Sequence, residues 1–427
     1  MSPIDDHPQR YALANELHAR PFPALTPPCH AAFLAITPSE DAANRDRMRD
    51  HAHLSALLAR HGAAPPPPEA AHWSGAIGRH ALTWESHTEF VTFSAFAEGL
   101  GTRPFDPSEA EVFPADWLAG APGTRLTSVL IRVDFLPEDP AQVMPLLRDW
   151  FVPESLACNW VLDRAAVVAG DFRIDPAGHM RFAVFVRPGT GPGRVGRIVQ
   201  RLCEIETYKA MSMLGLMRAR ALGARLNALD PELSEMVSGM GDAGRPPEGA
   251  LHALLGVTAQ LEELAVHSSF RFGATGAYEA LVNQRIGVLR EERFEGRQTF
   301  SEFMTRRYDP AMRTVKSTEA RLKALLERAT RAGELLRTRV DVERSAQNQK
   351  LLESMDRRAD LQLRLQHTVE GLSVVAISYY AVNLVSYALY PLAHALDWSK
   401  TASTAVLTPV VVLAMWLALR RIRKRMH

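Results

Sequence analysis

The sequence contains little that would indicate a disulfide-bonded, zinc-binding or nucleic-acid-binding protein. Its 427 residues include only three cysteines, Cys29, Cys158 and Cys203, and these form no CxxC or zinc-ligand spacing. Its 49 basic residues are balanced by 48 acidic ones, so the whole chain has no excess positive charge for binding nucleic acid. We therefore expect free thiols in a reducing compartment and no nucleic-acid partner.

Patterns typical of an enzyme are also missing. A glycine-rich turn at 189–196 lies between an expected strand and an expected helix, which is the context of a phosphate-binding loop. The Walker pattern would need Lys and Ser or Thr where this sequence has Arg197 and Ile198, so we favour a structural turn over a phosphate cradle. Glu204 and Glu206 are two apart on a helix and do not face each other. We expect no catalytic residues and no enzymatic activity.

The longest apolar stretches lie at the C-terminal end, at 369–392 and 402–419. Each can cross a bilayer core, which takes about 20 predominantly apolar residues. The first run has one charged residue, Glu370, at its edge, and the second has none. The short loop between them, 393–401, predicts a two-helix transmembrane hairpin. We prefer this interpretation to a hairpin buried in the core of a soluble protein.

The charged flanks of the hairpin predict its orientation. Five of the six residues at 420–425 are basic, and Arg357, Arg358 and Arg364 precede the first run. Basic flanks stay on the cytoplasmic side. Residues 1–20 have no apolar core and so no signal peptide. We therefore expect both termini to lie in the cytoplasm.

The N-terminal part predicts an α/β cytoplasmic domain at 1–190, because strand-like and helix-like patterns alternate there. Strands are expected at 31–36, 79–84, 89–96, 127–135, 156–169 and 179–186. Helices are expected at 41–61 and 140–150. The first of these should bury Met48, Leu54, Leu57 and Leu58.

From 191 the pattern is helical. A helical region at 191–310 should contain one helix at 195–229 and two antiparallel neighbours at 250–272 and 278–294. Asp309-Pro310 is typical of a helix start. The following stretch, 311–367, lacks proline and predicts a stalk helix about 85 Å long. We expect this helix to continue into the transmembrane hairpin, which with its basic tail spans 368–427. Apolar residues repeat along it every seven positions, as in a coiled coil: Val315, Leu322, Ala329 and Leu336.

The first apolar run carries a polar stripe centred on Asn383. Its members lie within about 60° of one line on a helix. An asparagine in mid-membrane is costly against lipid, so it should face protein or water. Either the stripe lines a pore, or it packs helix against helix with tyrosines anchored at the interface. The candidate pore-lining residues are Tyr380, Asn383, Ser386, Tyr387 and Tyr390, with Glu370 at the cytoplasmic mouth.

A polar cluster near the N-terminus has no assigned role. Its members are Asn15, Glu16, His18 and Arg20. Either they bind a ligand, or they belong to an arm that docks through Leu13, Leu17 and Phe22. We favour the docked arm.

Three motifs resemble those of a family of bacterial membrane-anchored proteins of unknown function. They are NELHARPF at 15–22, IETYKAM at 205–211 and RADLQLRLQHTVEGLSVVAISYY at 358–380, which include the sequences HARP and TVEGLS. The resemblance covers nearly the whole chain and implies membership of that family, but it implies no activity.

More remotely, the layout resembles the CorA-type metal-ion transporters. These combine a cytoplasmic α/β domain, a stalk helix continuing into the first membrane helix, a short external loop and a basic tail. The resemblance implies a homo-oligomer, a pentamer by analogy, with the first membrane helix lining the path. CorA-type proteins carry Gly-Met-Asn at the end of that helix, whereas 386–391 reads SYALYP here. The selectivity filter of those proteins is therefore absent.

Two functions remain open. One is a homo-oligomeric cation channel or transporter, for which we expect no cofactor apart from an unidentified divalent cation. The other is a scaffold or regulator anchored in the lipid bilayer, whose α/β domain binds a partner or a small ligand.

Overall fold

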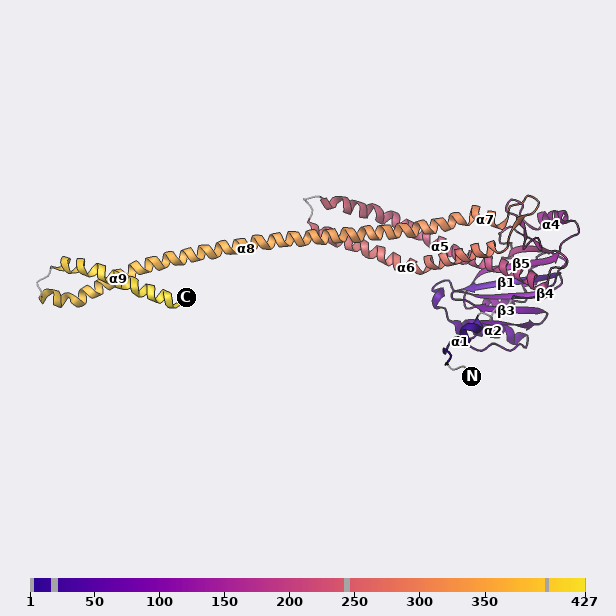
Figure 1. The fold of residues 1–427 in the computed structure, drawn as a ribbon, viewed down its shortest axis with the longest axis horizontal. Helices are drawn as coiled ribbons and strands as arrows, with labels where there is room; N and C mark the ends of the chain where they lie inside the picture. Colours follow the sequence, from indigo (N-terminus) through magenta and orange to yellow (C-terminus); the bar gives the residue numbers. More distant parts are fainter. Residues whose placement is uncertain (1–3, 17–21, 242–245, 396–398, 427) are drawn as a thin grey trace. The chain divides into compact units, whose positions relative to one another are not determined.

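The computed structural model describes residues 4–16, 22–241, 246–395 and 399–426. It contains an α/β sheet domain, long helices and two apolar helices near the C-terminus (Figure 1). The chain divides into two compact units. Unit 1 consists of Met1–Asp242 and His252–Ala332, and unit 2 of Ala243–Leu251 and Gly333–His427.

Unit 1 is built on one nine-stranded sheet with the order β2-β3-β4-β1-β5-β8-β7-β6-β9. Only β5 and β8 pair in parallel, and every other described pair is antiparallel. The strands are β1 (Cys29–Thr37), β2 (His72–Ile77), β3 (His80–Ser86), β4 (Val91–Glu98), β5 (Thr124–Phe135), β6 (Ala157–Val161), β7 (Ala166–Gly170), β8 (Met180–Val186) and β9 (Glu292–Arg293). The sequence did not predict β2 or β9.

One face of this sheet carries the main hydrophobic core. Three helices cover it: α2 (Arg47–Arg60), α3 (Ala115–Ala119) and α4 (Val143–Trp150). Leu54, Leu57 and Leu58 are fully buried, as predicted. The prediction for Met48 is wrong, because its side chain is 81% exposed. The helix begins only at Arg47, where the carboxylate of Asp46 caps the first turn, so Met48 lies outside the buried face.

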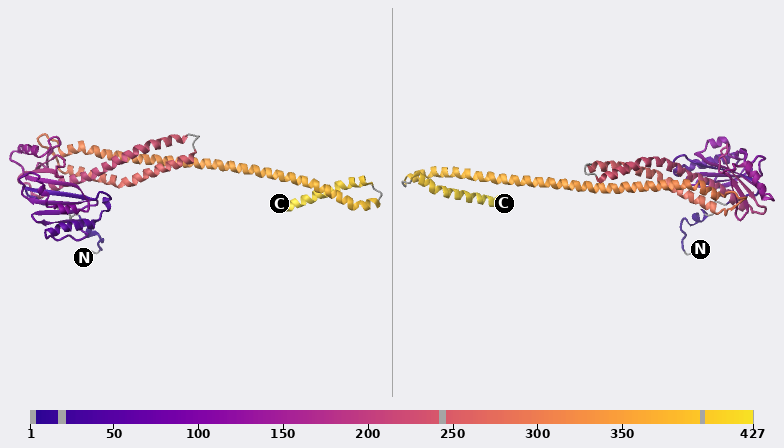
Figure 2. Two further views of the ribbon diagram at one scale, coloured as in Figure 1. Left: turned by 180° about the vertical axis from the view of Figure 1, so that it is seen from behind. Right: turned by 90° about the horizontal axis from the view of Figure 1, so that it is seen from above.

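The other face is covered by α5 (Pro192–Ser238), which contacts β1, β5 and β8. In unit 1, α5 runs alongside α6 (Pro247–Gly287) and the start of α8 (Figures 1 and 2). The expectation of two helices at 250–272 and 278–294 is wrong, because α6 is a single helix of 41 residues. Glycines inside a helix cost about 1 kcal/mol each. In α6, burial of apolar residues such as Leu261 and Val282 outweighs that cost.

After α6 the chain forms α7 (Phe300–Arg307), whose start carries a capping box between Thr299 and Glu302. Helix α8 (Asp309–Ala395) then runs for 87 residues, and it starts at the predicted Asp309. All four residues of the predicted heptad seam are buried: Val315, Leu322, Ala329 and Leu336.

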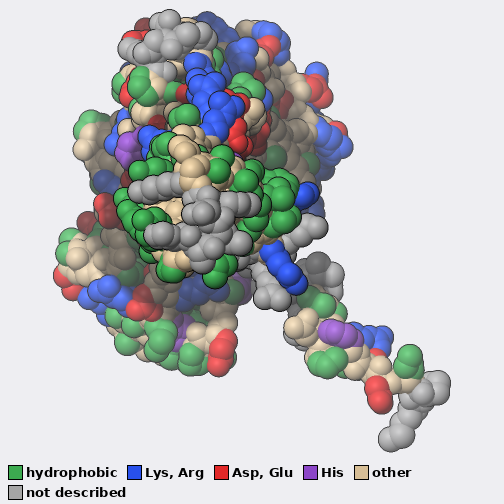
Figure 3. All heavy atoms as spheres, turned by 90° about the vertical axis from the view of Figure 1, so that its left-hand side faces the viewer, with side chains coloured by type: hydrophobic (Ala, Val, Ile, Leu, Met, Phe, Trp, Pro, Cys, Tyr) green, Lys and Arg blue, Asp and Glu red, His purple; other side chains and the backbone are tan. Residues whose placement is uncertain are grey.

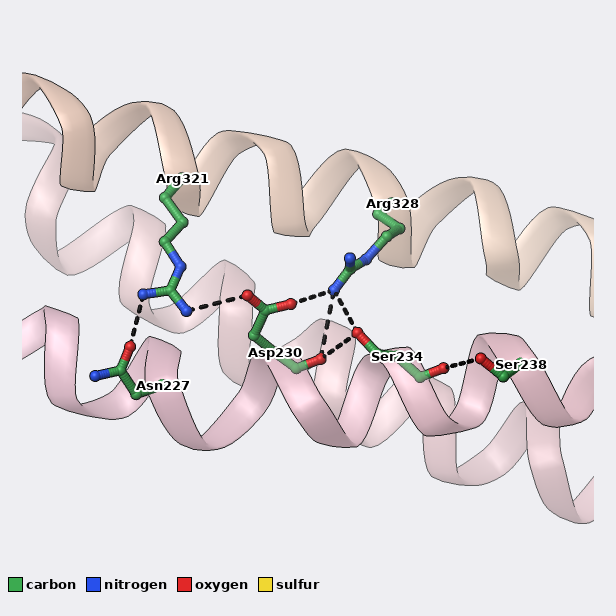
Figure 4. A network of polar contacts seen from close by, with 6 residues as sticks. All are labelled: Asn227, Asp230, Ser234, Ser238, Arg321 and Arg328. Carbon is green, nitrogen blue, oxygen red and sulfur yellow. Dashed lines mark hydrogen bonds and ion pairs between the residues drawn. The ribbon is translucent and has the colours of Figure 1, made fainter.

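Polar contacts join α5 to α8 within unit 1 (Figure 4). Asp230 of α5 accepts hydrogen bonds from Arg321, at 3.0 Å, and from Arg328, at 2.5 Å. Arg321 also donates to the side-chain oxygen of Asn227, at 2.7 Å. The hydrogen bonds to Arg328 and Arg321 hold the pKa of Asp230 below its usual value. Two arginines of α8 thus bracket one carboxylate next to Pro231, which lies inside α5.

In unit 2, the end of α8 and α9 (Lys400–Met426) form a helical hairpin. Helix α8 extends to Ala395, so the connection is shorter than the predicted loop at 393–401, and residues 396–398 lie outside the described part. In the view onto the end of the hairpin, hydrophobic side chains surround that end (Figure 3).

Candidate functional site

Both apolar runs of the sequence are helices long and apolar enough to cross a membrane. In unit 2, α9 crosses the last part of α8 (Figures 1 and 2). Among the side chains of this hairpin that the structure describes, Ser378 of α8 and Val411 of α9 are the buried ones, at 7% and 9% exposure. The face of α8 that contains Ser378 is therefore the one that packs against α9.

The predicted stripe lies on a different face of α8. Asn383 is five residues beyond Ser378, which places it about 140° away around the helix. Asn383 and Ser386 are half-buried, whereas the tyrosines of the stripe are exposed: Tyr380 by 67%, Tyr387 by 75% and Tyr390 by 57%. Packing within one chain therefore covers part of Asn383 and Ser386 but leaves the tyrosines of this stripe exposed.

Glu370 lies near the start of the apolar part of α8. Its carboxylate accepts a hydrogen bond from Gln366, at 3.4 Å, and lies 3.8 Å from a ring nitrogen of His367. Asn383 is 13 residues further on, about 20 Å along the helix axis. Glu370 is thus separated from the centre of the stripe and belongs to its outer end.

The N-terminal polar cluster is only partly described. Asn15 and Glu16 end helix α1 (Arg10–Glu16), and His18 and Arg20 lie outside the described residues. The expected docking of the arm is wrong for Leu13 and Phe22, because these side chains are 64% and 48% exposed.

A pocket with both polar and aromatic lining, which the sequence did not predict, lies between the sheet and α5. Its volume is about 40 Å³, which is room for roughly three water molecules. Strands β3 and β4 line one side, with hydroxyl groups of threonine and serine, and with Glu85. Helix α5 supplies Gln200, Glu204 and Thr207 on the other side.

Two carboxylates influence each other at this pocket. Burial raises the pKa of Glu204, the negative charge of Glu85 raises it further, and Arg285 opposes both effects. Gln200 also donates a hydrogen bond to Glu204, at 3.3 Å. Glu206, the glutamate of the IETYKAM motif, instead pairs with Lys209, at 2.6 Å. Glu204 and Glu206 therefore have different partners, as their spacing implies.

A family model matches residues 5–426. The chain belongs to the family described as Protein of unknown function (DUF3422). No curated protein matches the sequence. The match includes the N-terminal motif, the sheet domain, the long helices and the hairpin, so DUF3422 covers all of these elements but assigns activity to none.

The glycine-rich turn of this DUF3422 chain has a clear packing role at its last glycine. A Cβ at Gly196 would lie 1.7 Å from the carbonyl oxygen of Pro23, so only glycine lets the N-terminal segment lie against α5. The neighbouring amide of Leu25 donates to the carbonyl of Pro192, at 3.1 Å. These contacts account for Gly196, although not for the residues that follow it.

Metal ligands do not gather in the described part of this DUF3422 chain. None of its His, Cys, Asp and Glu side chains form a group of three or more that could hold a metal ion. The three cysteines are free and buried. Burial raises the pKa of the Cys29 thiol to about 12, so this thiol is a poor ligand and a poor nucleophile at neutral pH.

Proposed function

We propose that the α8–α9 hairpin spans a membrane and that several copies of the chain assemble around α8 to form a path for a cation. The observation that carries this proposal is the stripe centred on Asn383, whose tyrosines are exposed and whose asparagine is only half-buried within one chain. An amide group exposed to hydrocarbon is costly, so a second copy of α8 or a water-filled path should cover it. Rings of amide and hydroxyl oxygens in such an assembly could replace part of a cation's hydration shell.

The basic flanks of the hairpin favour a cytoplasmic location for the sheet domain and both termini, beneath the bacterial inner membrane. The resemblance to CorA-type transporters favours a homopentamer. The continuous helix α8 supports this comparison, since a stalk that continues into the first span is the main feature of that architecture. The absence of Gly-Met-Asn favours an ion selection different from that of those transporters.

Cation flux into liposomes tests the proposal. Purified protein is reconstituted and compared with the variants Asn383→Leu and Asn383→Gln. We expect Asn383→Leu to reduce flux by about tenfold or more, because one lost polar contact of about 1.4 kcal/mol corresponds to that factor. Asn383→Gln keeps the amide and should retain most of the flux. Unchanged flux in Asn383→Leu would contradict the pore assignment.

The number of subunits provides an independent test. Native mass spectrometry of the detergent-extracted protein should show a closed ring of identical chains. A monomer would remove the central path altogether, whatever the flux measurement gave.

A second candidate function rests on the pocket between the sheet and α5. Its carboxylates and hydroxyl groups suit a small polar ligand, and in this case the hairpin only anchors a regulator or scaffold to the bilayer. Liposomes that show no flux, together with a stable monomer, would favour this function. Neither proposal includes an enzymatic step.

A further inference from the structure

Four arginines line an open groove at the start of α5. The groove has a volume of about 620 Å³. Arg194, Arg197 and Arg201 come from α5, and Arg290 comes from the segment after α6. We call this feature the arginine groove. It lies wholly within unit 1.

The three arginines of α5 share one face of the helix. Their spacing of three and four residues places them one above another, where like charges repel. Burial lowers the pKa of Arg201; the negative charge of Glu204 opposes this, and the charges of Arg197 and Arg290 lower the pKa further. The folded protein therefore holds these guanidinium groups together against their repulsion.

Acidic residues compensate only part of this charge. Asp163 is the carboxylate that pairs with the groove, at 3.3 Å from Arg194 and 2.8 Å from Arg290. Arg201 donates to the carbonyl of Val288, at 3.3 Å. Within the described ranges, Arg197 is exposed and makes no hydrogen bond or ion pair. One guanidinium group is thus left free beside three that are already held in position.

The chemistry of the groove favours phosphate. Guanidinium groups present paired N–H donors that match phosphate oxygens, and several of them together favour an anion with more than one charge. No aromatic side chain lines the groove, so a nucleotide base would find no stacking surface there. Arg197 stands where the Walker pattern has its lysine, while Ile198 offers no hydroxyl for magnesium. This combination fits binding of a phosphate anion without its hydrolysis.

We propose that the arginine groove binds a small soluble anion that carries two or more phosphate groups. The bound anion would neutralise the excess positive charge on α5. It would also contact both the start of that helix and the segment at the end of α6. The proposal concerns unit 1 alone and does not depend on whether the hairpin conducts ions.

Isothermal titration calorimetry of the full-length protein in detergent tests this, with pyrophosphate as the probe in magnesium-free buffer. We expect saturable binding of one pyrophosphate per chain, tighter than the binding of orthophosphate. Arg197→Gln should raise the dissociation constant at least tenfold. The matched control is Arg225→Gln, which removes an equally exposed arginine of α5 that makes no hydrogen bond or ion pair in the described structure, and it should change the constant less than twofold.

Three results would overturn the proposal. The first is an absence of saturable pyrophosphate binding. The second is equal weakening of that binding by Arg225→Gln and Arg197→Gln, which would indicate a general charge effect. In a third arm, protein is mixed with vesicles containing phosphatidic acid. Binding to these vesicles that depends on Arg197, without binding of pyrophosphate, would make a lipid headgroup the ligand in place of a soluble anion.

Discussion

The contact between α5 and α6 at Gly215 gives the sharpest test of the helical packing. A Cβ at this position would lie 2.1 Å from Oγ1 of Thr275 and 2.9 Å from both its Cβ and its Cγ2. Thr275 is 2% exposed, so its side chain cannot move into solvent. Rotation about χ1 would shift Oγ1 and Cγ2 but not Cβ. The variant Gly215→Ala therefore has to push the two helices apart.

The size of this effect follows from two opposing terms. Forcing an extra methyl group into a packed interior typically costs about 1–3 kcal/mol. Replacing glycine by alanine inside a helix returns about 1 kcal/mol of intrinsic helix stability. Because rotation about χ1 cannot move the Cβ of Thr275 away, we expect the upper part of the packing range. The net loss in Gly215→Ala is then about 1–2 kcal/mol.

Gly223 provides the matched control on the same helix. No atom lies within 4 Å of a Cβ built there, so Gly223→Ala should gain about 1 kcal/mol from helix propensity alone. Thermal unfolding of the purified protein, followed by circular dichroism, measures both variants. A change of 1 kcal/mol moves Tm by about 2–4 °C in domains of 150–250 residues. Gly215→Ala should therefore lower Tm and Gly223→Ala should raise it.

Two results would refute this reasoning about the α5–α6 contact. One is a rise in Tm for Gly215→Ala equal to that of Gly223→Ala, because it would mean that the helices are not in close contact at Thr275. The other comes from the double variant Gly215→Ala/Thr275→Gly, which exchanges the small residue between the helices. The double variant should be about 1 kcal/mol more stable than the sum of the two single changes predicts. If the effects of the two changes on stability simply add, the contact is contradicted.

Two further predictions concern the dependence of stability on pH. Asp230→Asn should cost about 1 kcal/mol at neutral pH, since half-exposed ion pairs contribute about 0.5–1 kcal/mol each, while Glu232→Gln, an exposed change on the same helix, should cost little. The pKa of Asp230 is below its usual 3.8. The stability that its ion pairs contribute is therefore present above pH 3.8 and disappears as the pH falls through the lowered pKa. A loss of stability in Asp230→Asn that is equally large in strong acid would contradict the pairing. Burial lowers the pKa of His53 to about 4. As the pH falls below 6.5, the unfolded chain binds a proton at this histidine before the folded chain does. The free energy of unfolding should therefore fall between pH 6.5 and 4, by at most about 3 kcal/mol. His53→Phe keeps the aromatic stack on Trp117 and should flatten this part of the pH profile, measured by urea unfolding; an unchanged profile would exclude His53 as the titrating group.

The sequence predicted correctly those helices and buried faces that depend on residues close together in the chain. The Asp309-Pro310 pair correctly marked the start of α8, because an aspartate and a proline both favour the first turn of a helix. The heptad seam was recognisable because its spacing alone places Val315 and Leu322 on one face, and both are buried. The same holds for the buried leucines of α2, which follow a regular helical period.

Errors arose where tertiary contacts outweighed a local signal. Two helices were expected, at 250–272 and 278–294, yet α6 continues through the intervening residues, because its buried face is held between neighbouring helices in unit 1. Strand β2 was missed because it lies at the edge of the sheet, is largely half-exposed and contains Gly75, so the usual alternation is weak. Pairing with β3, which sets Trp73 opposite Trp84, forms it nonetheless.

The candidate sites likewise combine residues that the sequence pattern groups together with residues that only the fold brings close. The pocket brings Glu85 from β3 to Glu204 from α5, and no spacing rule connects two residues so far apart in the chain. Arg194, Arg197 and Arg201 are visible as a helical stripe in the sequence, but only the fold adds Arg290 to them and forms a groove.

The stripe on α8 shows what periodicity can and cannot determine. Periodicity alone identifies residues that share one helical face, but it does not say whether that face meets α9 or points away from it. The burial of Ser378 and Val411 shows which side of α8 packs most closely, and Asn383, about 140° away from Ser378, is only half-buried. A chain that inserts such a hairpin into lipid would leave several tyrosines and part of an amide to be covered by something outside its own fold. For these groups, the partner therefore has to be sought in a second copy of α8 or in water.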